Sequence, residues 1–431
     1  MANEIPPNSI ESPEAPQPRV PFDLFLAPGR GWFRALRHAE FRVFWMGNFV
    51  SNIGSWMQNV AQGWLVYELT HSPYWLGVVG FAQQIPSLLF SLPAGVVADR
   101  AARRKVLLYT QTVMMLLAGL LALLAYFKVV VIGHMVAIAF TAGTIMAFNA
   151  PTYQAAIRDL VQEQDTLNAI ALNSIQFNLS RVLGPSAAGI TIALAGTAAC
   201  FFLNALSYVP LLFVISRVKF PERAAAQNGN VGFRADLAEA FDYMRTHKDI
   251  LAIVTLVAMV SMFGLPYLTM MPAFANDVLH VGAKGLGYLV ASAGVGAFLG
   301  GLHLAQLKDS DKRGPLVLFA GLVFFAAIVG FSLSRNMVLS CLLLAVAGGG
   351  VVNCAATVNS LIQTRVPDHI RGRVLSMHTM AFLGFTPLGS FLVGWLAEKW
   401  SPATALALSG GIALVLTGWI ALTRRDVRAM H

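Results

Sequence analysis

The stretch Gly95-Val-Val-Ala-Asp99-Arg100-Ala-Ala-Arg103-Arg104-Lys105 concentrates its five charges in its last seven residues, between two long apolar runs. The run from Pro73 to Ala98 and the run from Val106 to Phe127 contain no charged residue. Both are longer than the roughly 20 apolar residues that a helix needs to cross a bilayer. A charged turn between two such runs is typical of the aqueous link between membrane helices. The chain is therefore predicted to be a polytopic membrane protein.

The composition of all 431 residues agrees with this interpretation. Hydrophobic residues make up 56% and charged residues 12%, and the mean hydropathy is +0.64, whereas soluble domains are about one-quarter charged. The apolar runs are continuous, which favours helices over the alternating strands of a barrel. We expect an all-α membrane protein with twelve transmembrane helices, starting near Phe41, Pro73, Lys105, Val131, Asn168, Gly196, Asp249, Gly285, Gly314, Met337, Arg373 and Pro402.

The basic residues predict the orientation, because Lys and Arg accumulate in cytoplasmic loops. With both termini placed in the cytoplasm, 25 of the 30 Lys and Arg residues fall on the cytoplasmic side. The net charge of +9 is then explained by topology, and nucleic acid is not an expected partner. The expected location is the bacterial inner membrane, with the lipid bilayer around the helices.

The longest polar stretch divides the predicted spans six and six. Two halves related by an axis along the membrane normal, with a cavity between them, form a known transporter plan. The predicted organisation is a disordered cytoplasmic leader with a short interfacial helix (1–39), an N-terminal six-helix half (40–216), a central cytoplasmic loop (217–248), a C-terminal six-helix half (249–425) and a cytoplasmic tail (426–431).

The charged turn in this twelve-span layout resembles the turn between spans two and three of the major facilitator superfamily. Phe41-Arg42-x-Phe-Trp-Met-Gly, Leu65-Val-Tyr-Glu-Leu-Thr70 and Arg181-Val-Leu-Gly184-Pro185-x-x-x-Gly189 resemble the enterobactin-exporter-like branch. Three features depart from the superfamily pattern: Ala102 replaces a usual Gly, Leu304 and Ala305 replace the Asp-Arg pair in the second-half copy of the turn, and span four lacks an intramembrane Arg. The third departure weakens any direct transfer of a proton mechanism.

The charged turn is also the candidate conformational latch. Gly95 would allow a facing helix to approach closely, and Asp99 would bind the N-terminus of a helix from the other half, which presents free N–H groups. The resemblance implies that this partner is span eleven. We expect the latch to comprise Gly95, Asp99, Arg100, Arg103, Arg104 and Asp159, with Asp159 pairing to the arginines. The alternative for the cations is that they only enforce the orientation.

Polar residues of span one recur on one helical face and predict the wall of a central cavity. This wall consists of Asn48, Asn52, Ser55, Asn59 and Gln62. Candidate cavity residues in other spans are Gln84, Asn149, Asn173, Gln176, Arg181, Asn353 and Asn359. The alternative for the amides is hydrogen bonding between helices. Arg181 is the single basic residue predicted deep in a span, so it is a candidate contact for an anionic substrate group or, alternatively, a partner of carbonyls freed by Pro185.

Two further sets of residues bear on transport. Gly184, Pro185 and Gly189 resemble a kink motif of exporters, although close packing of small residues also explains them. No Asp or Glu falls at mid-membrane. Glu68 and Asp277, near the outer span ends, are therefore the candidates for proton coupling, with a simple surface role as the alternative.

No catalytic, metal-binding or phosphate-binding motif occurs, so an enzyme, a cofactor and a bound metal are not expected. The resemblance implies a monomeric secondary transporter that exports small amphipathic molecules, siderophores or drugs, by alternating access and proton antiport. An importer of sugars or organic acids, and a non-transporting receptor with the same fold, remain alternatives.

Overall fold

The computed structural model describes residues 33–218, 220, 233–306 and 312–430, without the side chains of Leu92, Asp99 and 233–237. The leader up to residue 32 and much of the predicted central loop lie outside this part of the chain. Regular structure within it is helical. The chain begins with the short η1 (Arg34–Arg37) and continues through α2 (Ala39–Thr70), α3 (Pro73–Arg100), α4 (Arg103–Tyr126), α5 (Ile132–Asp159), η2 (Glu163–Asp165) and α6 (Thr166–Arg217).

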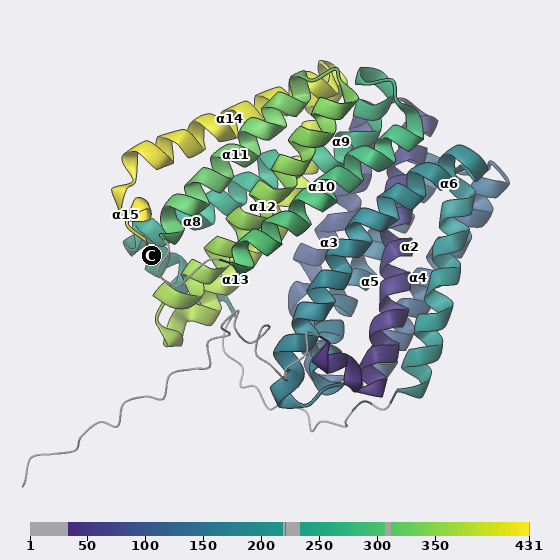
Figure 1. The fold of residues 1–431 in the computed structure, drawn as a ribbon, viewed down its shortest axis with the longest axis horizontal. Coiled ribbons are helices and arrows are strands. Elements are labelled where there is room, and N and C mark those ends of the chain that lie inside the picture. The colour runs from purple at the N-terminus through teal and green to yellow at the C-terminus, as the bar shows by residue number, and fades with distance from the viewer. Residues whose placement is uncertain (1–32, 219, 221–232, 307–311, 431) are drawn as a thin grey trace, which may run out of the picture.

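The second part of the chain repeats this pattern of long helices. Its elements are α7 (Phe233–Thr246), α8 (Lys248–Met259), η3 (Val260–Gly264), α9 (Tyr267–Ala273), η4 (Phe274–Val278), α10 (Gly282–Ala305), α11 (Arg313–Leu333), α12 (Met337–Arg365), α13 (Asp368–Lys399), α14 (Pro402–Thr423) and α15 (Arg425–Arg428). Figure 1 shows two bundles, α2–α6 in purple to teal and α8–α14 in green to yellow, which we call the N half and the C half.

Nine segments within the described residues are long and apolar enough to cross a membrane. One of them, Glu163–Arg217, is 55 residues long and bends sharply at Gly196, where φ is +78°. A side chain would strain the backbone at this φ, which glycine tolerates. The bend gives α6 two arms, 166–195 and 197–217. The chain is thus an all-helical, multi-span membrane protein.

Helix α2 is long enough to span a bilayer but carries the predicted polar stripe, which lowers its hydropathy. The segment Lys248–Val278 is interrupted differently, by the π-helical turns η3 and η4. The N–H of Leu265 bonds to the carbonyl of Val260, five residues back. Such π-turns accommodate local disruption of a helix, and here Pro266 and Pro272, which have no N–H to donate, lie beside them.

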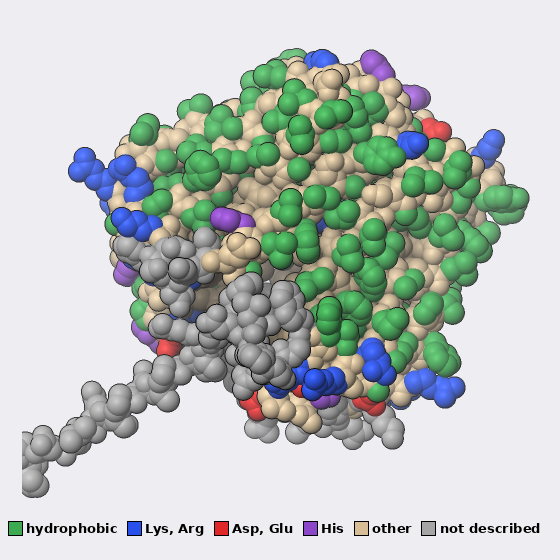
Figure 2. All heavy atoms as spheres, viewed as in Figure 1, with side chains coloured by type: hydrophobic (Ala, Val, Ile, Leu, Met, Phe, Trp, Pro, Cys, Tyr) green, Lys and Arg blue, Asp and Glu red, His purple; other side chains and the backbone are tan. Residues whose placement is uncertain are grey.

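Hydrophobic side chains cover the sides of both bundles (Figure 2). On the second arm of α6 the exposed side chains recur every three or four residues, at Phe202, Leu206, Val209 and Phe213. This spacing places them on one helical face. A soluble protein would bury such a face. This exposed hydrophobic face therefore belongs to the surface that lipid covers.

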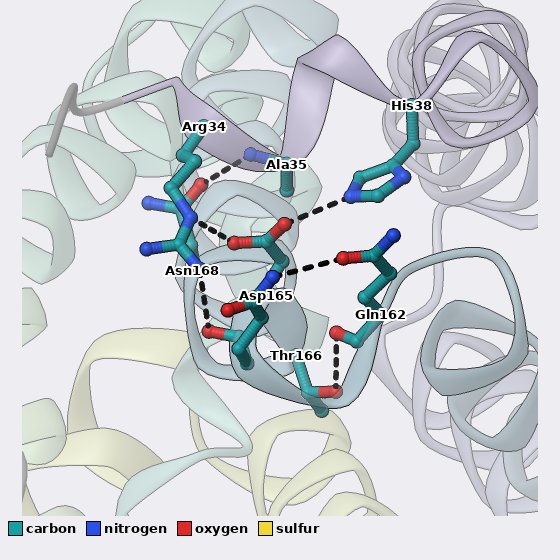
Figure 3. Close-up of polar contacts among 8 residues, drawn as sticks. Arg34, Ala35, His38, Gln162, Asp165, Thr166 and Asn168 are labelled. Carbon is teal, nitrogen blue, oxygen red and sulfur yellow. Dashed lines mark hydrogen bonds and ion pairs between the residues drawn. The ribbon is translucent and has the colours of Figure 1, made fainter.

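Helix η1, directly before α2, is fixed to the N half (Figure 3). The buried carboxylate of Asp165, in η2, forms an ion pair with Arg34 and a 2.8 Å contact with Nε2 of His38. The N–H of Ala35 donates to Oδ1 of Asn168 over 2.8 Å. These contacts hold η1, which lies where the sequence predicts an interfacial helix, against the start of α6.

The two halves meet at one end of the molecule and diverge toward the other (Figure 1). Helix α3 packs on α13, and α6 packs on α10. At the first crossing a Cβ added to Gly77 would lie 3.0 Å from Cα of Gly394, and at the second a Cβ on Gly189 would lie 3.1 Å from Cα of Gly287. We call the end with Gly77 the closed end, and the end with the 95–105 turn the open end.

Candidate functional site

A cavity of about 470 Å³ lies between the halves. Its polar lining comes mainly from α2 and α3 of the N half, and much of its apolar lining comes from the C half. Four predicted cavity residues lie in the wall, Ser55, Asn59, Gln62 and Gln84. An amide-rich wall facing an apolar wall suits an amphipathic ligand.

The amide wall is partly satisfied by its own neighbours. Ser55 Oγ lies 3.1 Å from the Tyr208 hydroxyl, and Gln83 donates to Oδ1 of Asn59 over 3.3 Å. Gln84 donates to the Gly80 carbonyl over 3.1 Å. Nε2 of Gln62 is buried and has no hydrogen-bond partner among the described residues. This N–H group is therefore an unsatisfied donor in the cavity wall.

Other predicted cavity residues form contacts between or within helices. Asn48 donates to the Tyr153 hydroxyl over 2.7 Å, and that hydroxyl donates to Asn173 over 2.6 Å. Asn149 accepts a 2.9 Å hydrogen bond from Thr110. These contacts match the alternative role of the amides, which is to join α2, α4, α5 and α6.

The remaining predicted polar residues have varied settings. Asn353 lies 3.0 Å from Nδ1 of His303, joining α12 to α10, and Asn359 accepts from Gln363 on its own helix. Asn52 is half-buried. Gln176 is fully buried, and neither of its amide atoms has a partner within the described part of the chain.

Arg181 lies at the junction of the two halves. Its guanidinium carbon is 5.7 Å from the centre of the Trp56 ring, and Trp56 lines the cavity. The Arg181 side chain also interacts with the hydroxyl of Tyr267, in the C half. Tyr267 is fully buried, and its hydroxyl makes no hydrogen bond of regular geometry among the described residues. The backbone carbonyl of Arg181 is 2.8 Å from the position that a Cβ on Gly294 would occupy. The cation is thus beside the cavity wall and in contact with both halves.

Carboxylates of the C half bind groups of the N half at the closed end. Asp277 accepts a hydrogen bond from the Tyr67 hydroxyl, and Glu398 accepts from Ser72 Oγ over 2.7 Å and from the Tyr74 N–H over 3.3 Å. The proton-coupling candidate Asp277 is therefore part of a contact between halves. Glu68, the other candidate, is exposed and has no ion pair within the described residues.

A second cavity, of about 600 Å³, surrounds these closed-end contacts. Its walls combine Tyr67, Asp277 and Glu398 with the basic or titratable side chains of His71, His280 and Arg335. This cluster is open to the solvent on the closed side. These ionisable groups therefore surround the contact between the two halves at the closed end.

The predicted latch lies at the open end. No described atom lies within 4 Å of a Cβ added to Gly95, so no helix of the C half faces it in this conformation. Arg103 forms an ion pair with Asp159, and Arg104 donates to the Ser216 carbonyl. Arg100 is exposed, and the side chain of Asp99 lies outside the described part. The observed pair joins α4 to α5 within one half.

The predicted kink motif is a packing site in this structure. A Cβ on Gly184 would lie 2.8 Å from the Ile53 carbonyl of α2, and Gly189 meets α10. Pro185 is buried beside them. The motif thus holds α6 against a helix of each half.

Sequence reasoning missed several residues of these sites, including Trp56, Tyr267, Tyr67 and Glu398. Aromatic residues are frequent in this chain, and nothing in their local sequence sets these apart. Glu398 adjoins Lys399 at a predicted span end, a position where a charged residue is ordinary. Their roles arise from partners far along the chain.

Comparison with known families extends over nearly the whole chain. Residues 31–431 match a family model described as transmembrane secretion effector. The staphyloferrin A transporter of Staphylococcus aureus is 25% identical over 87% of this chain and 94% of its own length. The enterobactin exporter EntS of Citrobacter koseri is 24% identical over 88% of this chain and 90% of its own.

Solved structures show the same fold at low sequence identity. A bacterial homologue of the human lysosomal transporter Spinster, in an inward-facing and unoccupied conformation, aligns with a TM-score of 0.68 at 13% identity, over 91% of this chain and 96% of its own. The nucleoside transporter NupG aligns with a TM-score of 0.66 at 15% identity, over 89% of this chain and 99% of its own.

Proposed function

The chain belongs to the transmembrane secretion effector family of the major facilitator superfamily, and from this premise we propose that it exports small amphipathic organic molecules across the bacterial inner membrane. Its homologues are transporters and not enzymes. The observation that carries the proposal is the match to siderophore transporters over almost the full length of both chains. Siderophores and drug-like molecules are accordingly the first substrates to test.

The proposed topology has twelve spans and both termini in the cytoplasm. The two arms of α6 supply two spans, and the segment Lys248–Val278 supplies one. Arg103, Arg104, Arg313 and Arg373 then lie at the cytoplasmic, open end, and the domain boundaries follow those expected from the sequence. The conformation described here corresponds to the inward-open state of an alternating-access cycle.

In the proposed cycle the substrate enters the central cavity from the cytoplasm. The halves then rock, so that the closed-end contacts of Tyr67 and Glu398 break and the open end shuts. Asp99 binds the N-terminal turns of α13, which begins at Asp368, in the outward-open state. A ligand shifts such an equilibrium by binding one state more tightly. One chain contains the whole cavity, which suits a monomer.

Proton antiport is the proposed energy source. Asp277 supports it best, because this carboxylate is accessible on the closed side and also joins the halves. A proton bound there would remove an ionic acceptor from the Tyr67 hydroxyl. Loss of this acceptor would weaken the closed end.

Efflux from cells tests the proposal. Cells expressing the chain, the Asp99→Asn variant or the control Asp242→Asn, an exposed carboxylate on α7, are loaded with catecholate and citrate siderophores or drug-like dyes. We expect wild-type efflux that a protonophore abolishes, at least tenfold loss in Asp99→Asn, and no change in Asp242→Asn. Absence of efflux with confirmed membrane expression would contradict export. Uptake into right-side-out vesicles would instead identify an importer, and binding without flux a receptor.

A further inference from the structure

The central cavity has a neutral lining, although charge stands directly behind it. Among the described residues, its lining includes Asn, Gln, Ser, Thr, Tyr and Trp side chains but no Asp, Glu, Lys, Arg or His. Trp56 is one of these lining residues, and the guanidinium of Arg181 stacks on it. A cation, and not a carboxylate, therefore sets the sign of the field at this wall.

Arg181 has no acidic partner within the described part of the chain. It lies midway between the start of α6 at Thr166 and the bend at Gly196, about 22 Å along the helix from the start. A cation at this depth of a membrane is costly to bury, so it normally faces a cavity or pairs with another group. The Tyr267 hydroxyl is neutral and offers it an oxygen without compensating its charge.

A further polar group at the site lacks a partner. Gln62 is 5% exposed and lines the cavity, and its Nε2 group has no hydrogen bond among the described residues. The Tyr267 hydroxyl is fully buried and is in contact with Arg181. Buried donors without acceptors are uncommon in folded proteins. A cation without a carboxylate partner and an unsatisfied amide donor together favour a ligand rich in acceptors.

We infer that the transported molecule is an organic anion, whose acidic group pairs with Arg181 while an acceptor on its body takes the N–H of Gln62. This inference rests on the proposed export function and names its substrate class. Trp56 and Gln62 are six residues apart on α2, or about 9 Å along the helix. The ligand therefore has to extend along α2 from Trp56 to Gln62, with an apolar body against Leu265, Leu268 and Met271 of the C half.

Binding to the purified full chain tests the inference without requiring transport. The probes are dansylglycine, an anion, its neutral isostere dansylglycinamide, and the cation dansylcadaverine, each followed by energy transfer from tryptophan. We expect dansylglycine to bind at least tenfold more tightly than the amide or the cation. Arg181→Gln should weaken dansylglycine binding at least tenfold and leave the amide unchanged. Arg181→Lys should bind dansylglycine with an affinity between those of the wild type and Arg181→Gln, because lysine keeps the charge but loses the planar stacking on Trp56.

A matched control is Lys399→Gln, which also removes a cation stacked on a tryptophan, Trp395, but at the exposed end of α13. It should leave all three affinities unchanged, and size-exclusion profiles check the fold of each variant. Equal binding of the three probes, no binding of dansylglycine, or an unchanged affinity in Arg181→Gln would overturn the anion site. Arg181-dependent binding combined with absent efflux of every compound would leave the anion site standing and remove the export proposal.

Discussion

At the scale of single residues, the helices approach each other where a side chain is missing. A Cβ added to Gly143 of α5 would lie 2.0 Å from the carbonyl oxygen of Gln83 in α3. This backbone oxygen cannot move away without displacing the helix. Gly119 of α4, in contrast, has no described atom within 4 Å of the same added atom.

We expect Gly143→Ala to destabilise the N half by about 1–3 kcal/mol, since overpacking forces backbone shifts. The matched Gly119→Ala should be neutral or stabilising by up to about 1 kcal/mol, because alanine favours the helix. Thermal unfolding of the detergent-solubilised variants measures both effects. Equal melting temperatures for the two variants would show that α3 and α5 are not packed as described.

At the scale of elements, polar residues divide into those that join helices and those that face the cavity. The stripe of α2 does both: Asn48 binds Tyr153 of α5, whereas Ser55, Asn59 and Gln62 line the cavity. The η1 helix illustrates the first role, because Asp165 joins it to α6 through Arg34 and His38 (Figure 3). One buried carboxylate thus contributes two of the contacts that position η1.

Asp165→Ala should release η1 from the N half. The loss of charge-assisted hydrogen bonds is worth about 1.5–3 kcal/mol, so amide hydrogen exchange in residues 34–38 should accelerate tenfold or more. Glu163→Ala, at an exposed position of the same turn, serves as the control. Unchanged exchange in Asp165→Ala would mean that the Ala35–Asn168 hydrogen bond and the packing of Ala35 and Phe41 hold the segment without Asp165.

At the scale of the whole molecule, the two halves touch at one end and separate at the other. Gly77 of α3 meets Gly394 of α13 at the closed end, whereas Gly95, eighteen residues further along α3, faces no described atom. The same helix therefore carries a glycine toward each end. Only Gly77 is in close contact with the other half in this conformation.

Bulky substitutions at these two glycines should bias the conformation in opposite directions. Gly77→Val should prevent the closed end from shutting and shorten the open-end distance, whereas Gly95→Val should favour the conformation described here. Spin labels at Arg158 and Arg365, both exposed at the open end, report that distance by pulsed electron paramagnetic resonance. A shift in the same direction in both variants would contradict a rocking motion of the halves.

The hydrogen bond from Tyr67 to Asp277 should stabilise the closed end modestly. A hydrogen bond to a charged group contributes about 1.5–3 kcal/mol, and the exposure of Asp277 reduces this value. Tyr67→Phe should therefore raise the population of the state open at this end severalfold, as measured with labels at Lys128 and Arg335. Tyr126→Phe, an exposed tyrosine of α4, should leave it unchanged. If both variants match the wild type, the bond does not contribute to gating.

The sequence by itself determined the class of the protein. An all-helical, multi-span transporter of this superfamily was predicted and is confirmed, because the free energy of placing a residue in lipid depends on that residue and adds along each span. The charged turn and the Gly-Pro motif carried the family resemblance for the same reason, since both are contiguous. Local sequence patterns were therefore sufficient to predict properties that depend only on residues close together in the chain.

Only the tertiary structure decided which residues meet. Tyr67 and Asp277 are 210 positions apart, and Arg181 reaches Trp56 and Tyr267 from separate helices. Such contacts depend on how each helix is rotated and where helices cross, and the crossings are set by small residues that pair between the halves, such as Gly77 with Gly394. The hydropathy of a span gives little information on how its helix is rotated. Lipid, protein and a neutral cavity all accept apolar residues, so different faces of one helix can have the same hydropathy.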